Sequence, residues 1–278
     1  MFNTPFLMID QFELNCLIQK NEIFQKFDLR SEDLKAYAQA RPVLQKDGSR
    51  AMISIDGVMM ANPSILDRIF MSAVSTIDLI QAVGDVYNDK NVKTVVFNMN
   101  TVGGEVTKLN VLSQAVYELS KVKQTASVNT GVMASAGYRV ASQTNHIFSD
   151  DVMNRTGSIG TYMQLFDTSK AFEKQGVEVT HIATGPFKGL PSQGVPISAD
   201  MKAYAMDLAK EMQAGFDSEV LRMRQGVDLS EGSEAKSGKA FTFEKSLELG
   251  LIDGMKSISE AFELLEAKNK VNMIRSRQ

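Results

Sequence analysis

Residues 94–104 read TVVFNMNTVGG, a nearly continuous apolar run that ends in two adjacent glycines. The run Thr94–Met99 predicts a buried β-strand, because short apolar runs bounded by turn residues are typical of strands covered on both faces. The Gly103–Gly104 pair permits unusual backbone angles and a close approach by another segment. A helix is expected directly afterwards, over Glu105–Val122. The stretch therefore predicts a strand, a tight turn and a helix in succession.

The same alternation of strand and helix continues on both sides of this stretch. Further strands are expected at Ala51–Val58, Thr125–Thr130 and His146–Phe148, and further helices over Ser75–Tyr87, Ser135–Ser142, Met201–Gln225 and Phe243–Leu249. Strands that alternate with helices favour an α/β fold built on a parallel sheet.

Three regions are expected along the 278-residue chain. Residues 1–50 are predicted to form a helical N-terminal extension, because apolar side chains between Phe12 and Phe27 recur at loosely helical spacing. Residues 51–260 hold the strand–helix alternation and form the main domain. Residues 261–278 are predicted to be a flexible polar tail.

Composition excludes several classes of function. The net charge is −3, so no strong basic field indicates a nucleic-acid partner. The single cysteine, Cys16, excludes an internal disulfide and a cysteine-based zinc site. The sequence contains no apolar run of about 18 residues and no signal peptide at Met1–Asp10, so we expect a cytoplasmic protein without a membrane anchor.

Ser135 is a candidate nucleophile in the segment GVMASAGY, residues 131–138. Its small neighbours leave the hydroxyl open and allow a substrate backbone to come close. Its place at the start of a predicted helix favours negative charge nearby. The alternative interpretation is a helix-capping serine followed by close helix packing.

A serine nucleophile needs a base, and the chain has only two histidines, His146 and His181. Neither stands beside an evident acidic partner, so we interpret both as structural. A lysine can act as the base where burial disfavours its charged form. Lys188, in TGPFK at residues 184–188, lies among small and apolar residues and is the candidate. The alternative is an ordinary solvated loop lysine.

The order of these motifs resembles the S49 peptidases, which include the signal peptide peptidase A group and phage capsid-assembly proteases. The resemblance extends over about residues 51–255, and it includes TGSIG at residues 156–160 and the late segments KAFT, residues 239–242, and GLIDG, residues 250–254. It implies roles for six residues: Ser135 as nucleophile, Lys188 as base, Ser158 as the residue that orients the lysine, and Gly103, Gly104 and Ala136 in oxyanion and substrate binding.

The sequence departs from the family pattern in two places. Asn100-Thr101-Val102 precedes the glycine pair where Asp-Ser-Pro is usual. Ala136 follows the nucleophile where glycine is frequent in cellular members, and this is more similar to the phage proteases.

The resemblance implies a ClpP/crotonase-type spiral of ββα units, assembly into a homo-oligomer through the Met201–Gln225 helix and the N-terminal segment, and no cofactor or metal. The favoured function is a Ser-Lys serine endopeptidase, a phage head-maturation protease that cleaves scaffold or capsid proteins inside the prohead. The alternatives are a soluble cellular signal-peptide-peptidase-like protease, a non-catalytic oligomeric scaffold of the same fold, and a crotonase-type acyl-CoA enzyme. In the last of these, Ser135 and Lys188 would have no role.

Overall fold

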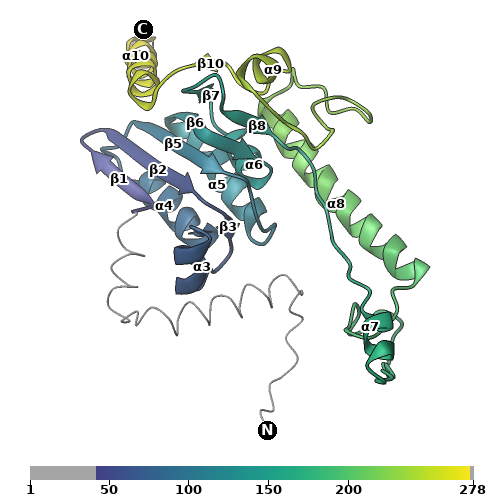
Figure 1. The fold of residues 1–278 in the computed structure, drawn as a ribbon. Helices are drawn as coiled ribbons and strands as arrows, with labels where there is room; N and C mark the ends of the chain where they lie inside the picture. The colour runs from purple at the N-terminus through teal and green to yellow at the C-terminus, as the bar shows by residue number, and fades with distance from the viewer. Residues whose placement is uncertain (1–41, 276–278) are drawn as a thin grey trace. The chain divides into compact units, whose positions relative to one another are not determined.

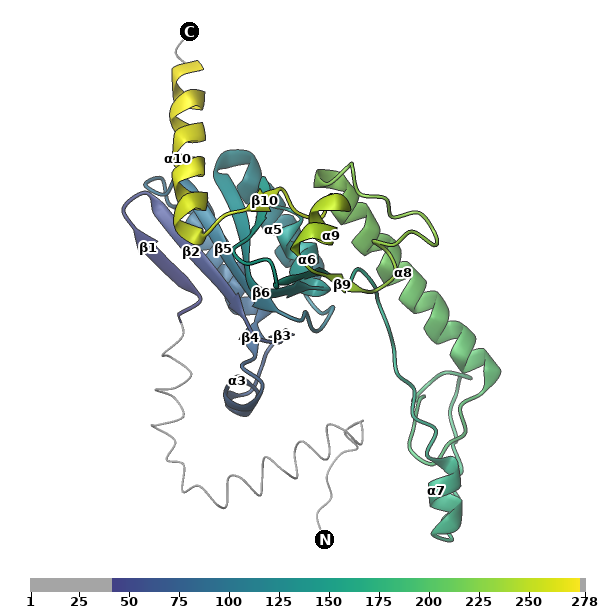
Figure 2. The same cartoon turned by 45° about the horizontal axis from the view of Figure 1, so that its top comes forward.

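A computed structural model describes residues 42–275 of the chain (Figures 1 and 2). These residues divide into two compact units. The sheet unit contains residues 42–160 and 214–275, and the Lys188 unit contains residues 161–213. The helices expected within residues 1–41 lie outside the described residues. None of the helices in the described part of the chain combines the length and apolar character needed to cross a bilayer.

Within the described residues, the sheet unit is built on an eight-stranded sheet. Its main row consists of β1 (Leu44–Asp47), β2 (Arg50–Asp56), β5 (Thr94–Thr101), β6 (Gln124–Ala134), β7 (His146–Ser149) and β10 (Gly254–Met255), in that order. Two short strands extend from this row: β8 (Arg155–Gly157) pairs with β6, and β9 (Ala240–Phe241) pairs with β8. All pairs except β1–β2 and β8–β9 are parallel. The predicted α/β fold with a parallel sheet is confirmed.

The remaining elements are one small sheet and the helices. Strands β3 (Met59–Met60) and β4 (Val74–Ser75) form a separate parallel pair. The helices are α3 (Ile65–Phe70), α4 (Thr76–Asn88), α5 (Leu109–Val122), α6 (Ala136–Ala141), α7 (Ser169–Lys174), α8 (Ala199–Met223), α9 (Phe243–Glu248) and α10 (Ile258–Arg275). Helix α7 and the first part of α8 belong to the Lys188 unit.

Helices cover the sheet on both faces (Figures 1 and 2). Successive side chains of β5 point to opposite faces, as in any strand. Val95, Phe97 and Met99 lie in the large core that includes α4 and α5. Val96 lies in a smaller core with Phe262 of α10. Burial on both faces explains why the segment that opens TVVFNMNTVGG is apolar at almost every position.

Two predicted boundaries are wrong. The chain is extended rather than helical at Leu44–Asp47, where β1 pairs antiparallel with β2 through a turn at Gly48, whose φ is 55°. A two-residue hairpin turn favours glycine because it needs a positive φ. The predicted flexible tail from residue 261 is instead most of α10, whose Ala261 and Leu265 are buried against the sheet.

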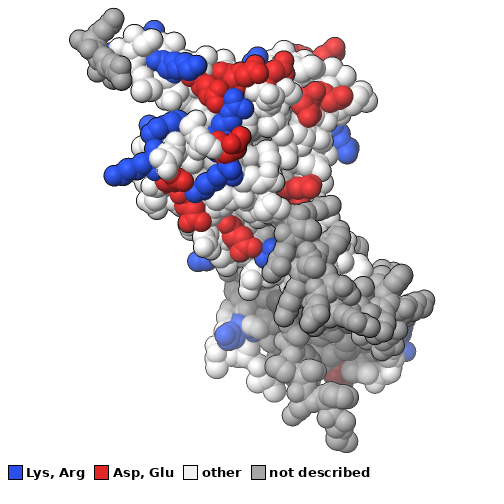
Figure 3. All heavy atoms as spheres, turned by 90° about the vertical axis from the view of Figure 1, so that its left-hand side faces the viewer, with Lys and Arg blue, Asp and Glu red and all other residues white. Residues whose placement is uncertain are grey.

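Polar contacts also fix α10 to the sheet. Basic and acidic side chains adjoin on the face shown in Figure 3. Arg50 of β2 donates from Nε and Nη2 to the two carboxylate oxygens of Glu266, at 2.6 and 3.0 Å. These hydrogen bonds lower the pKa of Glu266. The Arg50 guanidinium carbon also lies 5.3 Å from the centroid of the Phe262 ring.

Candidate active site

Ser135 lies between the end of β6 and the start of α6 in an unusual backbone conformation. Its φ is 51° and its ψ is −122°. Its N–H donates to the carbonyl of Gly157 at 2.9 Å, and its carbonyl accepts from the N–H of Arg139 at 2.9 Å. The side chain is half-buried and makes no capping hydrogen bond to α6. The capping interpretation is therefore not supported, and the hydroxyl is left for another use.

The position of Ser135 depends on a change in the strand that pairs with β6. Strand β6 pairs with β7 up to Asn129 and with β8 from Val132 onward. Its pairing with β5 shifts at the same place, since Met99 faces Asn129 whereas Thr101 faces Met133. Extra residues of this kind form a β-bulge, which redirects the end of a strand.

Two asparagines hold the bulge. The buried Asn129 accepts from the N–H of Gly131 at 3.0 Å and donates to Oγ1 of Thr156 in β8 at 2.9 Å. Asn100 donates to Asp56 at 2.9 Å and accepts from the N–H of Val132 at 3.3 Å. An ionised aspartate, the residue usual here in the family pattern, could accept the N–H of Val132 but could not donate to Asp56. Asn100 makes both contacts because its side-chain amide both donates and accepts.

Ser158 lies beside Ser135 at the same edge of the sheet. Strands β6 and β8 pair in parallel with Ala134 opposite Gly157, and each serine directly follows the last residue of its strand. Ser158 also has a positive φ, 52°, and its N–H donates to the carbonyl of Lys239 at 2.7 Å. The structure thus brings together two of the residues that the resemblance singled out.

The glycine pair lies directly against the serine. Gly103 has a φ of 100°, and a β-carbon there would lie 2.7 Å from Cβ of Ser135 and 2.9 Å from the amide nitrogen of Ala136. At Gly104, whose φ is 154°, a β-carbon would lie 2.0 Å from the carbonyl oxygen of Met59. Neither position has room for a side chain.

The backbone amides of this region differ in availability. The N–H of Gly103 donates to Oγ1 of Thr101 at 3.0 Å. Among the described residues, the N–H groups of Gly104 and Ala136 have no hydrogen-bond partner. Ala136 is the first residue of α6, where an amide has no partner within the helix. Of the three residues expected at the oxyanion, two therefore keep a free donor.

Lys188 belongs to the Lys188 unit, and its side chain is exposed. Its N–H donates to the carbonyl of Gly185 at 3.1 Å, and its own carbonyl lies 2.9 Å from Nε2 of His181. A carbonyl only accepts, so this His181 nitrogen carries the proton. The neighbouring ring of Phe187 stacks on Tyr204 of α8 with 5.2 Å between centroids. His181 thus binds the backbone of Lys188, and its purely structural role stays a prediction.

Helix α6 is held by buried polar contacts that the sequence did not reveal. Tyr138 is buried, which raises its pKa, and its hydroxyl donates to the carbonyl of Leu251 at 3.0 Å. Arg139 is also buried and donates to both carboxylate oxygens of Glu219 in α8, at 2.7 and 2.9 Å. The first contact gives the GLIDG segment a clear role, because its backbone anchors the helix that follows Ser135.

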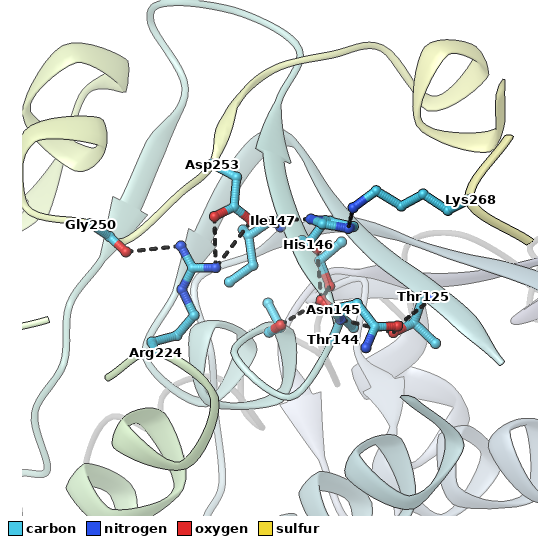
Figure 4. Close-up of polar contacts among 11 residues, drawn as sticks. Thr125, Thr144, Asn145, His146, Ile147, Arg224, Gly250, Asp253 and Lys268 are labelled. Carbon is cyan, nitrogen blue, oxygen red and sulfur yellow. Dashed lines mark hydrogen bonds and ion pairs between the residues drawn. The ribbon is translucent and has the colours of Figure 1, made fainter. Parts of the chain in front are cut away.

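His146 takes part in a separate network at the opposite end of β6 (Figure 4). Its Nε2 lies 2.6 Å from Nζ of Lys268 in α10, and its Nδ1 lies 3.9 Å from Asp253. Arg224 pairs with Asp253 at 2.9 Å and donates to the carbonyl of Gly250 at 2.9 Å. Burial, and next the charge of Lys268, lower the pKa of His146. These contacts connect β7 to α10, as a structural role for His146 would require.

A half-buried serine in a strained conformation between a strand and a helix, with a glycine loop against it, is typical of hydrolases that use serine as a nucleophile. Comparison with known protein families identifies the family within this class. The chain belongs to peptidase family S49, which matches residues 118–272, more than half of its length. The matched region includes Ser135, Ser158 and Lys188 and begins after the glycine pair.

Several relatives share the match. MJ0651 of Methanocaldococcus jannaschii, named as a candidate protease, is 28% identical over 67% of this chain and 60% of its own length. Serine protease SPPA, chloroplastic, of Arabidopsis thaliana is 26% identical over 73% of this chain and 29% of its own. Capsid assembly protease C of Escherichia phage lambda is 26% identical over 64% and 40%. The chain thus covers less than two thirds of the length of each of these relatives.

Solved structures that align with the chain include an enoyl-CoA hydratase/isomerase family member and an enoyl-CoA hydratase from Shewanella pealeana. Their TM-scores are 0.44 and 0.45, with 13% and 11% identity. The alignments cover 84% and 87% of this chain and 76% of each neighbour.

Proposed function

We propose that this chain is a serine endopeptidase in which Ser135 is the nucleophile and Lys188 the general base. The observation that carries the proposal is the conformation of Ser135, whose hydroxyl makes no hydrogen bond within residues 42–275 and against which Gly103 packs. Membership of peptidase family S49 supports it. No cofactor enters the reaction.

In the proposed reaction, neutral Lys188 takes the proton from Oγ of Ser135 while Oγ forms a bond to the carbonyl carbon of the scissile peptide. The tetrahedral intermediate then collapses, the C–N bond breaks, and the Lys188 ammonium gives its proton to the leaving amine. Water attacks the acyl ester in the same way and releases the serine. Since Lys188 is exposed, bound substrate has to remove water from its amine for it to act as a base.

The oxyanion is assigned to the N–H groups of Ala136, which follows Ser135, and Gly104, which follows the glycine packed against Ser135, because neither N–H has a partner among the described residues. One such donor is typically worth about a hundredfold or more in kcat. Gly103 contributes by its fit against Ser135, because its own N–H is occupied. Ser158, next to Ser135 in register, orients the amine of Lys188.

The test is cleavage of quenched fluorescent casein and of a mixture of denatured proteins, with the products identified by mass spectrometry. Ser135→Ala and Lys188→Ala should each abolish cleavage and leave the far-ultraviolet circular dichroism unchanged. Lys170→Ala, another exposed lysine of the same unit, is the matched control and should keep full activity. Activity retained by purified Ser135→Ala or Lys188→Ala would refute the dyad.

The proposed biological setting is phage head maturation, with scaffold or capsid proteins as substrates in the prohead. The similarity to capsid assembly protease C and the Ala136-Gly137-Tyr138 sequence support it. Coexpression with the neighbouring capsid genes, followed by mapping of the cuts, tests this setting. A gene that lies away from portal and capsid genes would favour a cellular protease, as the relatives from Arabidopsis thaliana and Methanocaldococcus jannaschii suggest.

Assembly into a homo-oligomer is part of the proposal. Tyr204 and Met206 of α8 expose large apolar side chains, which a second copy of the chain could cover.

A further inference from the structure

Thr101 connects the glycine loop to the end of β5. It is the last residue of the strand, and only 2% of its surface is exposed. Its Oγ1 accepts the N–H of Gly103 at 3.0 Å and lies 3.4 Å from the carbonyl oxygen of the same glycine. The hydroxyl therefore folds the first glycine back onto the strand that precedes it.

Both backbone polar groups of Gly103 are hydrogen-bonded, the N–H by Thr101 and the carbonyl by Met59. The carbonyl of Gly103 accepts the N–H of Met59 at 2.8 Å, and the carbonyl of Met59 accepts the N–H of Glu105 at 2.9 Å. The loop is thus bonded on one side by Thr101 and on the other by Met59. Gly104 lies between these bonded residues, and of the two glycine N–H groups only its own has no partner in the described part of the chain.

The methyl group of Thr101 makes a second contact, with the helix that follows the nucleophile. A β-carbon on Gly137 would lie 2.3 Å from Cγ2 of Thr101. A β-branched side chain is stiff about its first torsion, so a methyl held against α6 also fixes the direction of the hydroxyl. One side chain therefore sets the position of the loop relative to Ser135.

We propose that Thr101 is a positioning residue of the active site, which binds the N–H of Gly103 and so leaves Gly104 and Ala136 as the pair that meets the oxyanion. The inference rests on the proposed peptidase function. It assigns Thr101 a task that needs a hydrogen-bond acceptor on the side chain, which valine lacks.

Thr101→Val and Thr101→Ser separate the hydroxyl from the methyl. Valine keeps the shape but cannot accept the N–H of Gly103, so kcat on casein should fall by about a hundredfold, the scale of a misplaced catalytic group. KM should change little, because the loss is confined to the transition state. Serine keeps the hydroxyl but lacks the methyl that fixes its direction, so its kcat should lie well above that of the valine variant. Valine with full kcat, or serine as impaired as valine, would overturn the proposal.

A compensating pair tests the methyl contact and does not depend on how well the valine variant folds. Gly137→Ala alone should lower kcat, because its new β-carbon displaces the Thr101 side chain. Thr101→Ser with Gly137→Ala removes Cγ2, after which the nearest atoms to the new β-carbon lie at 3.7 Å. The double variant should recover the activity of Thr101→Ser. A double variant no better than Gly137→Ala would contradict the proposal.

Amide hydrogen exchange at Gly103, measured by NMR, gives a readout that needs no catalysis. Exchange should be slow in the original chain and in Thr101→Ser, and much faster in Thr101→Val. If the original chain cleaves nothing but shows this exchange pattern, the proposed function fails while the contact stands. If the chain cleaves casein and Gly103 exchanges equally fast in all three proteins, the positioning role fails alone.

Discussion

At the scale of single residues, Ser135 occupies a region of backbone space that serine rarely enters. Its φ of 51° with a ψ of −122° is more readily adopted by glycine. Such a conformation costs on the order of 1–3 kcal/mol and persists only where the surrounding structure imposes it. Here the hydrogen bond to Gly157 and the start of α6 impose it.

Ser135→Gly should therefore be more stable than Ser135→Ala, although both are inactive. Glycine relieves the backbone strain at position 135, but the greater conformational entropy of its unfolded chain offsets part of that stabilisation. We therefore expect the free energy of unfolding of Ser135→Gly to exceed that of Ser135→Ala by about 1 kcal/mol. Chemical denaturation of the two variants measures it.

Ser113, in the middle of α5, provides the matched comparison. In a regular helix, alanine is favoured over glycine by about 1 kcal/mol, so the order of the two variants should be reversed there. The same order at both positions would mean that Ser135 is not strained.

At the scale of elements, α10 is attached to β7 by the contact between Lys268 and His146. The imidazole faces Lys268 on one side and the Asp253–Arg224 pair on the other. Its pKa is lowered by burial first and by Lys268 second. In the unfolded chain, a histidine titrates at about pH 6.5.

Below about pH 6.5, the unfolded chain therefore binds a proton that the folded chain does not. The free energy of unfolding should fall as the pH drops from about 6.5 toward the lowered pKa of His146, and His146 should contribute no pH dependence at higher pH. Urea denaturation between pH 7.5 and 5.5 measures the slope. His146→Gln should flatten it.

The other histidine of the chain serves as the control, since His181 is exposed and lies in the Lys188 unit. His181→Gln should keep the slope of the original protein. If His146→Gln keeps it as well, another group is responsible for the acid sensitivity.

The helices and strands differ in how well local sequence patterns predict them. The β5 strand and the α4 and α8 helices are long, and their apolar patterns predict their type within a few residues. Strands β8, β9 and β10 have only two or three residues each. Their pairing depends on segments far away in the chain, so no local pattern could reveal them. In α10, charged residues between the few buried ones obscured the helix.

At the scale of the whole molecule, the exposed apolar side chains of α8 lead to a prediction about assembly. Sedimentation velocity should give a mass that is a multiple of 30.6 kDa. Met206 is 56% exposed, and Met206→Glu should shift the protein toward monomer, because a buried charge opposes association. Val122, which is 58% exposed at the end of α5, is the control, and Val122→Glu should assemble normally. A monomeric original chain would contradict the prediction.

The candidate site was only partly open to prediction from sequence. Short motifs identified Ser135, Ser158 and the glycine pair, since small residues at strand ends stand out against their neighbours. The structure joins these residues through the β6–β8 register and the Gly103 contact. Asn129 and Thr101 were missed as parts of the site because a buried polar side chain has meaning only through its partners.

The contact between Thr101 and Gly137 also bears on how this sequence can diverge. The methyl of one residue fills the space that a side chain on the other would need. Position 137 can therefore accept a side chain only where residue 101 lacks this methyl group. If alanine enters position 137 while Thr101 keeps its methyl, the intermediate has lowered activity, whereas serine at position 101 first removes the clash. A single methyl group thus favours one order of these two substitutions over the other.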